Sequence, residues 1–199
     1  MIRPLQRFAA TAALILTPTM AMAHTGVGAT TGFAHGFLHP LSGLDHLLAM
    51  VLVGMFAWQL GGRALWAVPA SFVGVMALGG VLGVAGLQLP LVEIGIALSV
   101  VVLGTMVAFR IQPPVALAMG VVAFFAVFHG HAHGSEMPET ASGLTYAAGF
   151  ILATALLHVS GIALGLGLGR VGGRLAPTVV RSAGGVAAVA GLAILTGVL

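Results

Sequence analysis

The chain has 199 residues, of which 59% are hydrophobic and 6% are charged. A soluble domain carries about 25% charged residues, so this composition argues against a soluble fold and indicates a polytopic helical membrane protein. The formal net charge of +3 is too small to indicate a nucleic-acid partner. All seven basic residues are arginines, which excludes a P-loop ATPase, and the absence of cysteine excludes a disulfide or a thiolate metal site.

Residues 1–23 have the features of a secretory signal peptide. Two arginines form a basic region, a short apolar segment follows, and Ala21-Met22-Ala23 resembles a cleavage site. Cleavage would leave His24 as the new N-terminus, where an amine and an imidazole together can chelate a divalent metal. The simpler alternative is that His24 only follows the cleavage site. Residues 24–199 are expected to form a single transmembrane domain.

Six apolar runs follow, and each is near the length of about 20 residues that a spanning helix needs. Residues 24–37 precede them as a Gly/Thr-rich lead-in outside the membrane. The linkers are short and contain glycine or proline. The sequence therefore predicts an all-α polytopic membrane protein with six transmembrane helices after a cleavable signal peptide, with approximate limits Leu38–Leu60, Ala64–Gly86, Leu91–Phe109, Val115–His133, Leu144–Leu168 and Arg181–Leu199.

Arginines predict the orientation of these helices. They occur in the linkers after the first, third and fifth runs, whereas the other two linkers have no arginine and contain Glu93, Glu136 and Glu139. Loops rich in arginine face the cytoplasm. The first helix is therefore expected to run inward, and both ends of the mature chain are expected outside the cytoplasm.

The first group of candidate ligands lies at the start of the first predicted helix. Pro40 suits the first turn of a helix, which would place His39 at the cap and His46 two turns further along. Seven residues return to nearly the same azimuth, so both imidazoles are expected on one helix face. Asp45 can bind a metal itself or orient a histidine by accepting its other N–H. His35 lies further out and is a weaker candidate.

The second group lies at the end of the fourth predicted helix. His129 and His133 are four residues apart and Glu136 follows three residues later, so the three align if the helix continues beyond His133. His131 points elsewhere in this arrangement. The glycines between these residues remove side-chain bulk and leave room for an ion or for a partner backbone.

The predicted topology places both groups in the outer half of the membrane, with Glu93 at the same face. Ionisable side chains at membrane depth are costly, so a function is their default explanation. Imidazole and carboxylate ligands suit Ni²⁺, Co²⁺, Zn²⁺, Fe²⁺ or Cu²⁺. His158, deep in the fifth helix, is either a packing residue or a further point on an ion path. Glu93 either reaches interfacial water or belongs to the site.

Two segments of the chain resemble the signature motifs of the HupE/UreJ family. They are His39-x-x-x-x-x-Asp45-His46 and Phe128-His129-Gly130-x-Ala132-His133-Gly134-x-Glu136. The family consists of nickel/cobalt permeases of bacterial membranes that are linked to hydrogenase and urease. The resemblance implies uptake of Ni²⁺, or Co²⁺, across the inner membrane and implies the metal ligands His39, Asp45, His46, His129, His133 and Glu136. In a bacterial inner membrane, the two mature termini that the arginines place outside the cytoplasm are expected to be periplasmic.

These observations predict a permease rather than an enzyme, with the metal ion as transported substrate and no permanent cofactor. Two alternatives stay open: a membrane-embedded metal-dependent hydrolase that holds a zinc-activated water, and an accessory protein that binds metal without transporting it. The sequence decides neither the driving force nor whether the chain forms a homo-oligomer.

Overall fold

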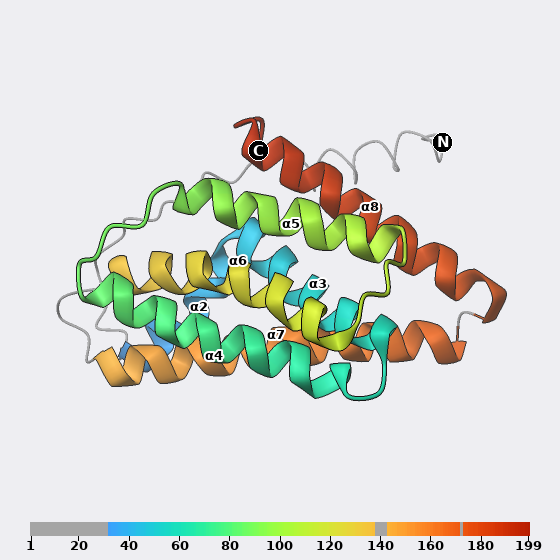
Figure 1. Cartoon of the computed structure of the whole chain (residues 1–199), viewed down its shortest axis with the longest axis horizontal. Coiled ribbons are helices and arrows are strands. Elements are labelled where there is room, and N and C mark those ends of the chain that lie inside the picture. Colours follow the sequence, from blue (N-terminus) through green and yellow to red (C-terminus); the bar gives the residue numbers. More distant parts are fainter. Residues whose placement is uncertain (1–31, 138–142, 172) are drawn as a thin grey trace, which may run out of the picture.

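The computed structural model describes residues 32–137, 143–171 and 173–199, and these residues contain α-helices and one short 3₁₀ helix without any strand (Figure 1). The predicted signal peptide, His24 and Glu139 lie outside the described residues. The all-α prediction is confirmed. The elements in chain order are α2 (Gly32–Ser42), α3 (Leu44–Leu60), α4 (Ala64–Val84), α5 (Val92–Ala108), α6 (Val115–Ser135), α7 (Gly143–Val171), η1 (Gly173–Leu175) and α8 (Ala176–Leu195).

Helix α3 is the centre of the bundle (Figure 1). It packs against α4, α5 and α7, and every residue from Met55 to Ala57, together with most of the preceding two turns, is buried. Around it, α4 pairs with α6, α5 pairs with α8, and α2 pairs with α7. The helices on the outside keep large apolar side chains exposed, among them Leu144 on α7 at 85% and Val186 on α8 at 71%. Such surfaces suit a hydrocarbon environment better than water.

The first predicted helix is in fact two helices, which corrects the continuous span expected over Leu38–Leu60. Helices α2 and α3 meet at an angle of 83°. Gly43 separates them with an extended backbone (φ −97°, ψ 126°). Glycine disfavours a helix interior, and Pro40 removes a helical hydrogen bond one turn earlier. Pro40 lies in the last turn of α2, not in a first turn, and residues 32–37 are helical.

Helix lengths support four to five membrane spans among the described residues. Four helices, α4, α6, α7 and α8, are long and apolar enough to cross a membrane, and the bent pair α2 and α3 passes the same test if it is one span. Helix α5 has 17 residues and is shorter. The last helix begins at Ala176, ahead of the predicted Arg181, because Pro177 is well suited to a first turn.

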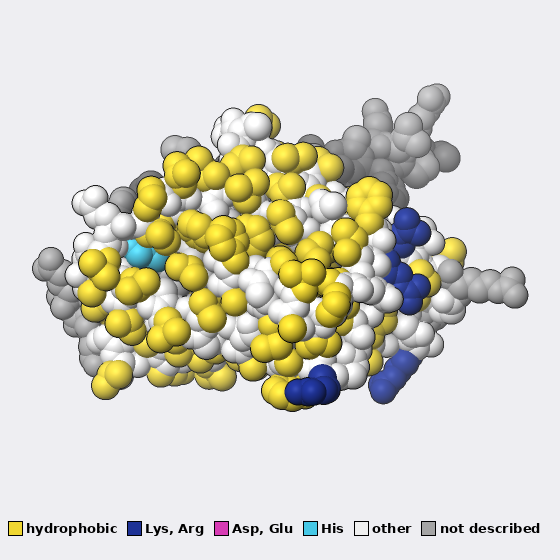
Figure 2. All heavy atoms as spheres, viewed as in Figure 1, with side chains coloured by type: hydrophobic (Ala, Val, Ile, Leu, Met, Phe, Trp, Pro, Cys, Tyr) yellow, Lys and Arg dark blue, Asp and Glu magenta, His cyan; other side chains and the backbone are white. Residues whose placement is uncertain are grey.

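The surface of the molecule is polarised along its long axis. Figure 2 shows a largely hydrophobic face with arginine side chains gathered at one end and a histidine visible toward the other. The arginine end is where α3, α5 and α7 finish and where α4, α6 and α8 begin. The histidine-rich ends of α2 and α6 and the start of α3 lie opposite. This separation agrees with the alternation of basic loops in the sequence.

Glycines bring helix backbones into direct contact. A Cβ on Gly130 would overlap the carbonyl oxygen of Met76, and one on Gly134 would overlap that of Gly80. Helix α6 therefore lies directly on α4, which is how small residues act in membrane bundles. His129 and His133 precede these glycines by one residue, which is about 100° around α6, and both are buried inside the bundle.

Candidate metal site

Histidines from three helices meet at the end of the bundle opposite the arginines. The ring of His133 on α6 lies 4.6 Å from that of His39 on α2 and 4.5 Å from that of His46 on α3, between ring centroids. The His46 ring is also 4.8 Å from that of His129, one turn deeper on α6. These four imidazoles, His39, His46, His129 and His133, are called the outer cluster below.

The bend at Gly43, not a shared helix face, brings His39 and His46 together. The two residues lie on α2 and α3, which differ in direction by 83°. The seven-residue spacing that was expected to align them therefore has no such role. Both rings nevertheless contact His133, because the chain turns around it. The expected convergence is present and its predicted geometric reason was wrong.

Asp45 orients the ring of His46. The Nδ1 atom of His46 lies 2.8 Å from Asp45 Oδ1, and the backbone N–H of His46 donates to the same oxygen at 2.7 Å. An ionised carboxylate only accepts hydrogen bonds, so Nδ1 carries the proton and Nε2 keeps a free lone pair. His46 Nε2 is buried and has no hydrogen-bond partner among the described residues. Carboxylates orient metal-binding histidines in this way.

Ser99 on α5 does the same for His129. The Ser99 hydroxyl donates its single proton to the carbonyl of Ile96 at 2.6 Å, so its oxygen accepts from His129 Nε2–H at 3.0 Å. His129 Nδ1 then keeps the lone pair. This atom is also buried and unpartnered within the described part of the chain. The site thus has a second ring whose free nitrogen is fixed by a neighbour.

Glu136 closes the outer cluster on the solvent side. Its Oε2 lies 3.1 Å from His39 Nε2, and the two side chains are 56% and 24% exposed. Helix α6 ends at Ser135, which holds Glu136 directly after the last turn. The hydrogen bond from His39 lowers the pKa of the Glu136 carboxyl, so this group stays negatively charged at neutral pH.

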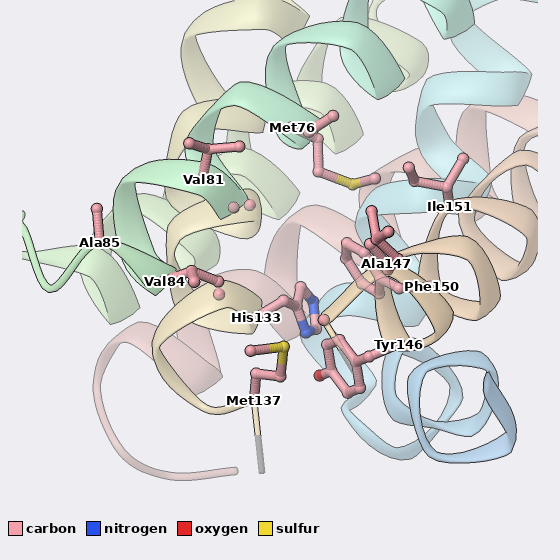
Figure 3. Close-up of a pocket in the computed structure, with 16 residues that line it drawn as sticks. Met76, Val81, Val84, Ala85, His133, Met137, Tyr146, Ala147, Phe150 and Ile151 are labelled. Atoms are coloured by element: carbon pink, nitrogen blue, oxygen red, sulfur yellow. The ribbon is translucent and has the colours of Figure 1, made fainter. Parts of the chain in front are cut away.

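His133 is the residue that the other rings surround. It is 2% exposed, and neither of its ring nitrogens has a hydrogen-bond partner in the described ranges. A cavity of about 620 Å³ between α4, α6 and α7 reaches it. Figure 3 shows the His133 ring among Met137, Tyr146 and Phe150 at this mainly apolar cavity. The Phe150 ring is 3.8 Å away between centroids.

The weaker candidates are scattered. His35 is exposed on α2 and its ring lies 6.1 Å from that of His39, between centroids. His131 points away, as expected, and donates from Nε2 to the carbonyl of Leu87 at 2.6 Å. Glu93 is exposed at the start of α5. His158 is 1% exposed and lies outside the outer cluster, beyond Phe72.

Sequence reasoning did not find several residues that shape the site. Ser99 is one of them, although a serine within the apolar run of α5 was a visible signal. Tyr146 contacts His39 with ring centroids 6.2 Å apart, and its hydroxyl is buried without a hydrogen-bond partner among the residues described. Phe72 and Phe150 had no signal, because aromatic residues are common in apolar helices.

The outer cluster brings possible metal-binding atoms near one another, but they are not arranged as a complete coordination shell in the described residues. Among the described residues, no group of three or more His, Asp or Glu side chains is placed to hold a metal ion together. The buried nitrogens are nonetheless unusual, because nearly all buried polar atoms in proteins have a partner. Free nitrogens of His46, His129 and His133 share a buried region of touching rings, and that donor set suits a borderline dication.

Comparisons with known proteins cover nearly the whole chain. A family profile described as HupE / UreJ protein matches residues 12–194. A relative called Protein HupE, from Rhizobium leguminosarum bv. viciae, is 50% identical over 188 residues, which are 94% of this chain and 96% of the relative. No solved structure matches the chain.

Proposed function

The chain belongs to the HupE/UreJ family, whose members are permease-like accessory proteins and not enzymes, and we propose that it takes up Ni²⁺, or Co²⁺, across the bacterial inner membrane. The imported ion would supply nickel enzymes such as hydrogenase or urease. The ion is the substrate of this process, and no permanent cofactor is needed.

The observation that carries the proposal is the set of free, buried imidazole nitrogens in the outer cluster. An unpartnered buried polar atom costs about 1–3 kcal/mol. His46 Nε2, His129 Nδ1 and both nitrogens of His133 carry that cost together in one place. A dication that binds them exchanges its water ligands for nitrogen donors. We propose that small rotations of these rings complete the ligand set.

Two carboxylates support the entry of a dication. Glu136 is half-exposed at the mouth of the site, and Asp45 lies beside His46. Their negative charge lowers the cost of moving a doubly charged ion away from water. His39 and Glu136 are the most exposed ligands of the proposed site, so we propose that they capture the ion before the buried rings receive it.

We further propose six membrane spans after a cleaved signal peptide of residues 1–23. The bent pair α2 and α3 would be the first span, and α5 would be the third despite its 17 residues. The exposed arginines support a cytoplasmic position for their end of the bundle. The outer cluster and both mature termini then face the periplasm.

The test is nickel accumulation by a metal-starved strain that depends on this protein. Asp45→Asn and His46→Ala should each reduce uptake at least tenfold, because the first loses the charge that orients the ring and the second loses the ligand. His35→Ala, on the exposed face of α2, is the control and should keep most of the uptake. Near-normal uptake by both site variants would reject the assignment. Metal binding without uptake by the unchanged protein would favour an accessory protein.

A further inference from the structure

The row of touching rings does not end at the outer cluster. The ring of Phe72, on α4, lies 5.5 Å from that of His129 and 5.2 Å from that of His158, between centroids. All three side chains are buried, with exposures of 0%, 0% and 1%. A single phenyl ring thus contacts both the deepest imidazole of the outer cluster and another imidazole on α7.

The side chain of His158 has two ring nitrogens that are available to bind a metal ion. Both of its ring nitrogens are buried and unpartnered within the described ranges. Thr154 lies one turn earlier on the same side of α7 and is 0% exposed. The Thr154 hydroxyl donates to the thioether sulfur of Met76 at 3.7 Å, a weak acceptor, and Met76 lies one turn after Phe72 on α4.

This group of donors is held rigidly. The backbone of α7 at His158 lies directly on α3, because a Cβ at Gly54 would overlap the His158 carbonyl oxygen. Gly161, one turn further, is packed in the same way against Val51. A histidine on closely packed helices cannot swing out to reach water. Its two nitrogens therefore need a partner that comes to them.

We propose that His158 and Thr154 form an inner metal-binding station, and that the Phe72 ring closes the path between this station and the outer cluster. The inference rests on the proposed permease function and extends it inward. A phenyl ring has no lone pair to replace the water of a transition-metal dication, so the ion passes only when Phe72 turns aside. Met76 is the further soft donor beside the station.

The first test separates binding from passage. In purified protein reconstituted into liposomes, His158→Leu removes both nitrogens and keeps an apolar side chain. We expect nickel binding at the outer cluster within twofold of the unchanged protein and nickel influx reduced at least tenfold. Leu157→Ala, a buried truncation on the same helix, is the control and should keep influx within about threefold.

The results distinguish the two proposals. If the unchanged protein neither binds nickel nor admits it, the permease function itself fails. If the unchanged protein transports nickel and His158→Leu transports it equally well, only the inner station is wrong. Loss of outer binding in His158→Leu would also overturn the inference, because His158 would then act on the outer cluster.

The second test uses the absence of cysteine from the chain. H158C introduces one thiol. The variant is treated with a small membrane-impermeant thiol reagent that is added on the side of the outer cluster. With Phe72 intact we expect slow labelling, and in F72A we expect labelling at least tenfold faster. F56A truncates a fully buried phenylalanine on α3 and should leave the rate unchanged.

F72L is the second variant if F72A loses outer nickel binding, and it should give an intermediate rate. Fast labelling of H158C with Phe72 in place would overturn the proposed barrier. So would equal labelling rates in H158C alone and in H158C combined with F72L or with F56A.

Discussion

Hydrogen bonds at His46 and His129 decide which ring nitrogen of each is free to bind a cation. Asp45 accepts a hydrogen bond from Nδ1–H of His46, and the Ser99 oxygen accepts one from Nε2–H of His129. The free atoms are therefore Nε2 in one ring and Nδ1 in the other. The two rings contact each other almost perpendicularly, at 85°. A correct tautomer on each ring prepares the site before the ion arrives.

Ser99→Ala should weaken nickel binding without removing a ligand. The His129 ring would lose its only described hydrogen bond, and partners of metal-binding histidines typically contribute about 10–100-fold in affinity. We expect roughly a tenfold rise in the nickel dissociation constant, measured by titration calorimetry on purified protein. Ser160→Ala is the matched control, since the Ser160 hydroxyl donates to the carbonyl of Leu156 in its own helix. An unchanged dissociation constant in Ser99→Ala would remove Ser99 from the site.

Nickel uptake should fall as the pH decreases, because protons compete with the metal ion for the histidine nitrogens and a protonated histidine cannot bind metal. Glu136 does not cause this fall. Its pKa is lowered by the hydrogen bond from His39, so its charge is fully present at neutral pH and is lost only at much lower pH. The measurement is the initial uptake rate from about pH 5.5 to 7.5. Glu136→Gln should lower the rate at every pH but keep the fall toward acid pH, and a rate that no longer depends on pH in Glu136→Gln would contradict this explanation.

At the residue scale, the sequence predicted ligands better than their partners. Histidines and carboxylates are rare in this chain, so their grouping stood out against an apolar background. Ser99, Phe72 and Tyr146 contact the histidines from other helices, and only the packing of α4 and α5 on α6 and of α7 on α2 reveals them. Sequence spacing carries no information about such contacts between helices.

The break between α2 and α3 is the feature of the elements that matters most for the site. Because of this break, His39 contacts the His133 ring from α2 and His46 contacts the same ring from α3. Apolar composition alone predicted one span, because both halves are apolar. Pro40 and Gly43 indicated a helix end near these residues. A proline there is compatible with either the first or the last turn of a helix, so the sequence did not decide which. Helix packing decided between them.

Gly130→Ala should disturb the contact between α4 and α6 and, with it, the outer cluster. The added Cβ would meet the Met76 backbone, which cannot move as a flexible side chain can. Overpacking typically costs about 1–3 kcal/mol, so a lower melting temperature and reduced nickel uptake are expected. Gly120→Ala in the same helix has open space at its Cβ and should leave both unchanged. Equal melting temperatures for the two variants would show that α6 can shift without cost.

For the whole molecule, composition and arginine placement predicted the helical architecture and its orientation. The path of the ion could not be predicted from the sequence. The predicted all-helical architecture follows from the need to satisfy every backbone hydrogen bond in lipid. The arginines lie at one end of the molecule, and the helix ends that carry the outer cluster lie at the other, as the alternating linkers indicated (Figures 1 and 2). The cavity beside His133 and the continuation from Phe72 to His158 depend on how helices distant in sequence pack together.

Nickel influx into liposomes that contain only the purified protein tests the central claim most directly. The unchanged protein should accumulate external radioactive nickel faster than protein-free liposomes, and His133→Ala should abolish the difference, because His133 contacts both His39 and His46. Influx by His133→Ala equal to that of the unchanged protein, or no influx in a sample that binds nickel, would contradict the account.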